Sequence, residues 1–240
     1  LTNAVRSIPA YIERSDFVAI VAPGCLHADR RNPKTKLRAK MCFRTWRGRG
    51  WCVLEMFASF LSREKQHPVL LIRSSSNAPQ WLSSMQTQRL AVGTCNFTCC
   101  QRNHVFSGKV VTCDRIITRS ILHTMIESKI DHHFQQLDIL NARWFVCFKN
   151  WWLRGLPEEK EDEDEEEMET DDNNKDDDES AIMINLIKAL RWNYNIDSAW
   201  FDRSKTSILC YAVVRNNAKE VLQILRSLND DKTTGFLEMN

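Results

Sequence analysis

The chain has 240 residues, 43% of them hydrophobic, which is enough for one large domain or two small ones with a true core. No apolar run approaches the ~20 residues that cross a bilayer, and no secretory signal opens the chain. The nine cysteines are scattered along the sequence, which indicates reduced thiols and a soluble, cytoplasmic protein.

The net charge of +2 hides a sharp segregation of charge along the chain. Residues 1–157 carry 23 Lys/Arg against 9 Asp/Glu, a net charge of +14, whereas residues 158–179 carry 16 acids against 2 Lys, a net charge of −14. Like charges at this density repel one another and bury nothing. We therefore predict a disordered acidic linker over residues 157–179 between two folded parts.

The first predicted elements alternate between helix and strand. Residues 1–15 indicate the end of a helix, and 16–24 are a short apolar run typical of a strand buried on both faces. Residues 25–50 are rich in Lys and Arg and predict a basic loop. Residues 51–64 predict an amphipathic helix. Its apolar face consists of Val53, Met56, Phe57, Phe60 and Leu61.

The alternation continues through the middle of the chain. Residues 67–74 predict a second buried strand, 79–92 a short helix, and 95–100 a third strand. Residues 113–134 predict a long helix with Asp114 as its N-cap. Buried strands that alternate with amphipathic helices indicate an α/β layer with a mainly parallel sheet.

The remaining segments predict helices. Residues 141–156 are aromatic and basic, which suits either a helix packed on the domain or one that lies on a membrane; packing is the favoured interpretation. Residues 180–195 predict a helix with Ser180 as its N-cap, and 206–229 predict two short helices around Asn216 and Asn217.

Residues 7–74 resemble the central part of a TIR (Toll/interleukin receptor) domain. The resemblance rests on a helix, a strand, the stretch "WCVLEM" that opens a second helix, and a second strand. Plant-type members of the family have a similar signature, matched here by Trp51, Cys52, Val53, Glu55 and Met56. Membership would imply a flavodoxin-like fold for residues 1–156. The family's first strand and helix would precede Leu1, so a fragment that lacks the N-terminal part of the domain is expected.

The TIR resemblance also implies a candidate activity. Active members of the family cleave NAD at the nicotinamide–ribose bond with the glutamate that aligns with Glu55. A carboxylate suits this reaction because bond cleavage develops an oxocarbenium cation, which a nearby negative charge stabilises. The alternative is that Glu55 is only a charge near a helix start, where the macrodipole favours an acid.

Residues 207–225 resemble one ankyrin repeat within a helical segment, 180–240. Leu209 and Ala212 match the first helix of such a repeat; Asn216 stands in the place of its usual turn glycine. Positions of the second helix are matched by Val221, Ile224 and Leu225. A single repeat cannot bury its own apolar face, so a neighbouring repeat or a partner is expected. The stretches "SIPAYIERSDF" and "RGWCVLE" are also similar to segments of ankyrin-bearing multidomain proteins of unicellular eukaryotes.

Two further groups of residues suggest binding. Nine cations could attract nucleic acid or anionic lipid head groups, although basic loops are more often simply solvated. They are Arg30, Arg31, Lys34, Lys36, Arg38, Lys40, Arg44, Arg47 and Arg49. The pattern C-x3-C-C-x3-H-x8-C is formed by Cys95, Cys99, Cys100, His104 and Cys113. Its thiolates and imidazole are ligands that suit zinc. Its spacing matches no recognised zinc module, so buried thiols are favoured and neither a metal nor a cofactor is predicted.

The sequence thus favours a signalling or scaffold protein that binds other proteins through its TIR-like surface or its ankyrin-like segment. The alternative is a NAD glycohydrolase that uses Glu55, with NAD as a substrate only.

Overall fold

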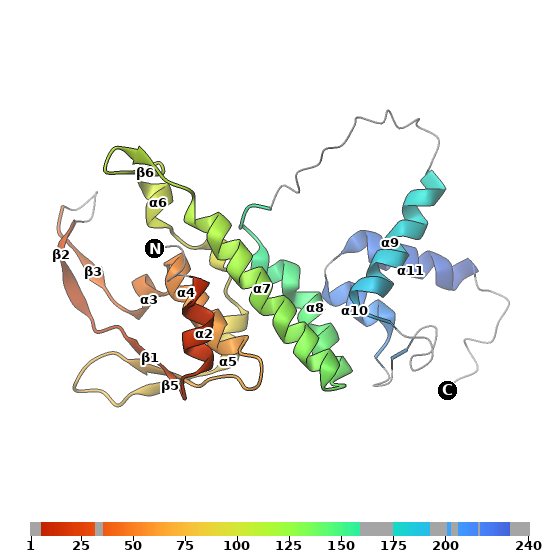
Figure 1. Cartoon of the computed structure of the whole chain (residues 1–240), viewed down its shortest axis with the longest axis horizontal. Helices are drawn as coiled ribbons and strands as arrows, with labels where there is room; N and C mark the ends of the chain where they lie inside the picture. The colour runs from red at the N-terminus through yellow and green to blue at the C-terminus, as the bar shows by residue number, and fades with distance from the viewer. Residues whose placement is uncertain are drawn as a thin grey trace. The chain divides into compact units, whose positions relative to one another are not determined.

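The computed structural model of the chain describes residues 6–31, 36–158, 175–192, 201–202, 206–215 and 217–230, without the side chains of residues 29, 30, 175–180 and 226–230. The chain divides into two compact units (Figure 1). The first comprises residues 1–132 and 149–160, and the second comprises residues 133–148 and 161–240. Most of the acidic run, residues 159–174, lies outside the described residues.

The first unit contains a three-stranded mixed sheet in the order β1-β4-β5. Strand β1 (Val18–Val21) runs parallel to β4 (Val69–Ile72), and β5 (Gln80–Leu82) pairs with β4 in the antiparallel direction. The expectation of an α/β layer is confirmed. The sheet has one parallel and one antiparallel pair. The prediction of parallel strands therefore holds for β1 and β4 but not for β4 and β5.

Helix α4 (Gly50–Phe60) connects the two parallel strands and covers one face of the sheet. Met56 of α4 packs with Ile20 of β1 and Leu71 of β4 in one buried cluster. The predicted apolar face of this helix is confirmed, because all five of its residues are buried. Val21, by contrast, is 65% exposed. Strand β1 is therefore buried on one face rather than on both.

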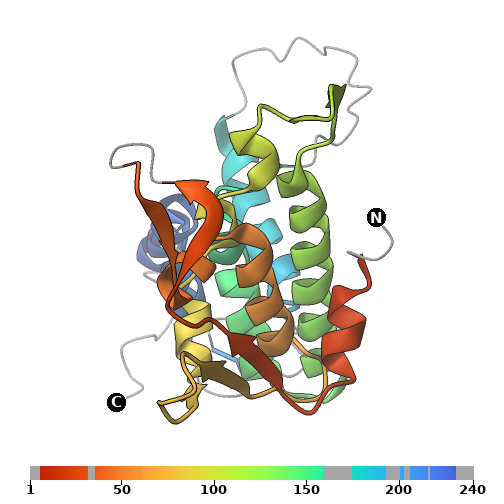
Figure 2. The ribbon, with the colours of Figure 1, turned by 90° about the vertical axis from the view of Figure 1, so that its left-hand side faces the viewer.

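Helix α2 (Ile8–Glu13) precedes β1 and contacts α4. Pro9 lies in its first turn, where the missing N–H costs no helical hydrogen bond. Figure 2 shows α2 and the long helix α7 (Asp114–Gln135) beside α4. The prediction of a helix over 113–134 is confirmed, but Asp114 is its first residue rather than its N-cap.

Three local predictions were wrong. The predicted basic loop contains an antiparallel pair, β2 (Cys25–Arg31) and β3 (Arg38–Met41), followed by the short helix α3 (Phe43–Trp46). The predicted helix over 79–92 is instead β5 followed by α5 (Ser84–Gln88). Of the predicted strand over 95–100, residues 95–97 follow a 3-10 turn (Val92–Thr94), and residues 98–100 belong to the helix α6 (Thr98–Gln101). In the first two segments, strand pairing outweighed a weak local pattern. In the third, a helix begins at Thr98, because an apolar run this short does not specify a strand.

A small antiparallel hairpin joins α6 to α7. Its strands are β6 (Val105–Phe106) and β7 (Lys109–Val110), and the two-residue turn between them has positive φ at Ser107 and Gly108, 49° and 76°. Positive φ at both turn residues gives the backbone twist that tight hairpins favour. The hairpin extends beyond the end of α6 (Figure 1).

Helix α8 (Ile139–Leu153) follows α7. Phe145, Val146 and Trp152 on it are buried, which confirms the packing interpretation of the aromatic segment. Among the described residues, no helix has both the length and the hydropathy that crossing a membrane requires.

The second unit consists of the first part of α8 together with α9 (Lys175–Ala189), α10 (Ile208–Val214) and α11 (Ala218–Asp230). The predicted helix pair over 206–229 is confirmed. Helix α9 begins at Lys175 rather than at Ser180, inside the predicted linker.

The structure draws the boundary between the units within α8 rather than near residue 156. The physical reason is Arg143, which is 1% exposed. Its Nε donates to the carbonyl of Leu190 at 2.9 Å and its Nη1 lies 3.3 Å from Oδ2 of Asp202. A buried guanidinium needs such partners, and they lie beyond the acidic run.

Candidate metal centre

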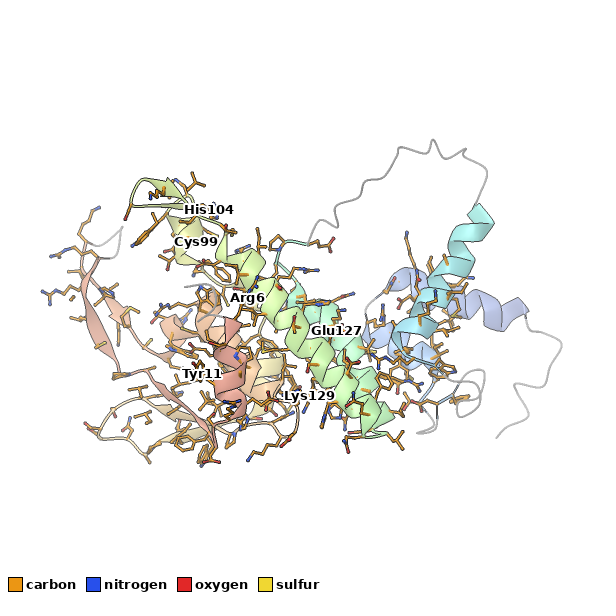
Figure 3. The ribbon with its side chains drawn as sticks, in the orientation of Figure 1. Arg6, Tyr11, Cys99, His104, Glu127 and Lys129 are labelled. Carbon is orange, nitrogen blue, oxygen red and sulfur yellow. The ribbon has the colours of Figure 1, made fainter. Side chains whose placement is uncertain are left out.

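Four side chains of the first unit converge where α6 leads through the β6–β7 hairpin into α7. They are Cys99 and Cys100 on α6, His104 just before β6, and Cys113 just before α7. Figure 3 shows Cys99 and His104 at the base of the hairpin. His104 can turn back toward α6 because Asn103 and His104 adopt positive φ, 50° and 58°. Positive φ costs conformational free energy in a non-glycine residue, and residues in this conformation are enriched at functional sites.

The separations of the four ligand atoms match a tetrahedral metal site. The nitrogen and three sulfur ligand atoms all lie within 4.8 Å of one another. Sγ of Cys100 is 3.8 Å from Sγ of Cys99 and 3.7 Å from Sγ of Cys113. Two sulfurs bound to one tetrahedral zinc at ~2.3 Å lie ~3.8 Å apart, whereas a disulfide requires ~2.05 Å. The arrangement therefore suits a bound ion and is too wide for a disulfide.

Two further details of the site also suit a bound metal ion. Nε2 of His104 is buried, and within the described part of the chain it has no hydrogen-bond partner. The backbone N–H of Asp114 donates to Sγ of Cys99 at 3.3 Å, a bond that favours a negatively charged sulfur. Burial raises the pKa of the free Cys99 thiol to about 12. A metal ion overcomes this because it displaces the proton.

Helix α4 is tied to the same region through Trp51 and Gly50. Nε1 of Trp51 donates to Oδ2 of Asp114 at 3.0 Å. Gly50 packs against Phe97, one residue before α6, so closely that a Cβ on Gly50 would lie 2.1 Å from the ring. Two residues of the "GRGWCVLEM" stretch thus support the region that holds the cysteines.

Glu55 lies on α4, one turn after Trp51, and is half-buried. Burial raises the pKa of its carboxyl, and the positive charge of Arg49 acts in the opposite direction. Cys52, also on α4, is buried, and burial raises the pKa of its thiol to about 11. A half-buried carboxyl with a raised pKa is a candidate functional group, although structural positions produce the same shift.

A cavity of about 450 Å³ lies between α2, α4 and α7, bordered by Glu13 and Arg63, and Glu55 does not line it. The carboxylate of Glu13 accepts two hydrogen bonds from the Arg63 guanidinium, at 2.8 and 3.0 Å. The buried Nζ of Lys129 donates to the carbonyls of Ser62 and Arg63 at 2.7 Å each (Figure 3). The Lys129 contacts hold the residues after α4 against α7, and the Glu13 contacts hold them against α2.

The described cations among the predicted polyanion-binding residues lie on β2, just before β3, on β3, on α3 and in the turn before α4. Lys34 and the side chain of Arg30 lie outside the described residues, and the other seven side chains are exposed. The guanidinium of Arg47 lies over the Phe43 ring, 5.7 Å from its centroid.

The sequence had shown the five residues of the metal pattern but not that four of them meet. Cys95 stays outside the cluster and donates to the carbonyl of Ala91 at 3.5 Å. The hairpin was missed because its strands are only two residues each, although Ser107-Gly108 is a turn signal.

Comparison of the chain with protein-family models, with curated proteins and with solved structures gives no match.

Proposed function

We propose that the chain is a scaffold protein whose first unit is stabilised by one zinc ion. The ligands are Cys99, Cys100, His104 and Cys113. The observation that carries the proposal is the convergence of these four ligand atoms within 4.8 Å. Four protein ligands of the Cys3His type leave no open position for a substrate, which is typical of structural rather than catalytic zinc.

The scaffold role is supported by exposed apolar residues of the second unit. Val213 and Val214 on α10, and Leu222 and Leu225 on α11, are each 45–57% exposed, whereas Ala212 and Ile224 are buried. A helix pair with apolar side chains on both its inner and outer faces suits a repeat that packs on a neighbour. The ankyrin resemblance supports the same proposal.

The zinc site is tested by the metal content of the purified full chain. We expect about one zinc per chain by mass spectrometry of the metal, because a closed site binds a single ion. Cobalt substitution should give the absorption bands of tetrahedral thiolate coordination. Cys100→Ser and Cys113→Ser should lose the metal, and Cys95→Ser is the matched control because its thiol lies outside the cluster. Zinc-free protein, or equal loss in all three variants, would contradict the proposal.

A second candidate function is NAD cleavage, favoured by the half-buried Glu55 and its raised pKa. The parallel β1–α4–β4 connection adds support, because ligands of such sheets bind beyond the carboxyl ends of the strands. Nicotinamide release by the wild type that is abolished in Glu55→Gln, and retained in Glu64→Gln, would establish this activity. Equal rates in both variants would exclude a catalytic Glu55.

A further inference from the structure

The β6–β7 hairpin carries apolar side chains that the rest of its unit does not cover. Val105, Phe106, Val110 and Val111 are 44%, 57%, 85% and 37% exposed. The hairpin projects from the unit in both views (Figures 1 and 2). Four exposed apolar residues within seven positions form a patch rather than scattered surface residues.

The apolar residues occupy both faces of the ribbon. Val105 pairs with Val110, and Phe106 pairs with Lys109. Because side chains alternate between faces along a strand, the valine pair points to one face and Phe106 to the other. Val111 continues the ribbon through a 2.8 Å bond from its N–H to the carbonyl of His104, on the same face as Phe106. Apolar side chains on both faces suit insertion into a lipid interface, which can surround the whole ribbon.

The two formally charged residues of the hairpin segment, residues 101–113, are both positive. Residues 101–113 contain Arg102 and Lys109 and no Asp or Glu. The guanidinium of Arg102 lies over the Phe106 ring, 5.5 Å from its centroid, and Lys109 borders the turn. Basic side chains next to an aromatic and aliphatic tip match a surface that is anionic outside and apolar beneath.

We propose that the β6–β7 hairpin inserts Phe106, Val105 and Val110 into the interface of an anionic membrane. Arg102 and Lys109 meet the lipid phosphate and carboxylate groups. The inference rests on the proposed zinc site, because an isolated two-stranded hairpin is only marginally stable in water. His104 and Cys113 flank the hairpin, so a shared metal ion would close its base.

The test is sedimentation of the zinc-loaded full chain with vesicles. One set contains phosphatidylcholine alone and the other adds phosphatidylserine. We expect binding to the anionic vesicles that weakens with salt, and little binding to the neutral ones. Phe106→Ala with Val110→Ala should weaken partitioning at least about tenfold, because two side chains no longer leave water. Trp81→Ala is the matched control, since Trp81 is 63% exposed on β5 of the same unit.

The outcomes separate this inference from the zinc proposal. Zinc content is measured for every variant. If the zinc-loaded wild type binds neither kind of vesicle, the membrane inference is overturned and the zinc proposal is unaffected. Unchanged vesicle binding by the double variant also overturns it, because binding would then not depend on the apolar side chains of the hairpin. Capture of single-stranded RNA or of an acidic peptide, without vesicle binding, overturns it as well. Loss of vesicle binding on chelation, and its return with Zn²⁺, supports both proposals.

Discussion

Trp51 and Asp114 are 63 positions apart in the sequence and are joined by a hydrogen bond of 3.0 Å between indole Nε1 and carboxylate Oδ2. The N–H of the same Asp114 donates to Sγ of Cys99. Trp51 is thus hydrogen-bonded to the residue whose N–H contacts a candidate zinc ligand.

Trp51→Phe is expected to weaken both zinc affinity and folding. It removes one hydrogen bond to a charged acceptor, worth about 1.5–3 kcal/mol, and the partly buried position of Trp51 favours the lower end. Loss of such an outer contact typically lowers metal affinity about 10–100-fold. Chelator competition and urea unfolding measure the two effects. Trp81→Phe is the control, and an unchanged zinc affinity in Trp51→Phe would separate the tryptophan from the metal centre.

In the second unit, breaking the buried pair of Arg143 and Asp202 should greatly lower the free energy of unfolding. Asp202 also accepts bonds from the Tyr211 hydroxyl at 2.5 Å and from the N–H of Thr206 at 2.9 Å, and the Arg143 guanidinium lies 4.4 Å from the Trp192 ring centroid. Arg143→Ala removes one partner of this buried ion pair, which costs about 3–5 kcal/mol.

The exposed pair of Arg63 and Glu13 provides the comparison for that measurement. Arg63→Ala should cost less than about 1 kcal/mol, because solvent screens the 2.8 Å contact and the Arg63 side chain is 58% exposed. Urea unfolding of both variants gives the two values. Similar costs would mean that Arg143 contributes no more than a surface ion pair.

Glu55→Gln is expected to stabilise the fold at neutral pH. Burial raises the pKa of Glu55 above its ordinary value of 4.5, so the folded chain holds this proton more tightly than the unfolded chain. Ionisation as pH rises through the folded pKa therefore costs folding free energy, and the cost is absent below the unfolded pKa. The free energy of unfolding of Glu55→Gln should exceed that of the wild type at pH 7, and the difference should be absent at about pH 4. Glu64→Gln is the control at an exposed position. If the difference in the free energy of unfolding between Glu55→Gln and the wild type does not change with pH, burial does not raise the pKa of Glu55.

The basic residues on β3 should control any binding of polyanions. Arg38→Glu with Lys40→Glu reverses two exposed charges, so heparin affinity and its dependence on salt should both fall. Lys65→Glu, an exposed change outside this segment, is the control. Deletion of residues 158–179 should tighten binding, because their 16 acids compete for the same cations. Binding that does not depend on salt would exclude this role.

Elements that depend on local periodicity could be predicted from the amino-acid sequence alone. The helices α4 and α7 and the pair α10–α11 follow from apolar residues repeated at helical spacing, because one face of each must leave water. The charge segregation between residues 1–157 and 158–179 is likewise explicit in the sequence. Short elements such as β5 and β6 were misassigned or missed, because two or three residues carry too little pattern to reveal a strand.

Which of the potential ligand residues lie close together could be learned only from the folded chain. Five residues in C-x3-C-C-x3-H-x8-C fit buried thiols as well as a metal, since cysteine is a common core residue. The turn at Ser107-Gly108 and the positive φ of His104 bring four ligand atoms together and leave Cys95 outside. The bond between Trp51 and Asp114 depends in the same way on the packing of α4 beside α7. Such contacts depend on backbone turns and long-range packing, which spacing along the chain does not encode.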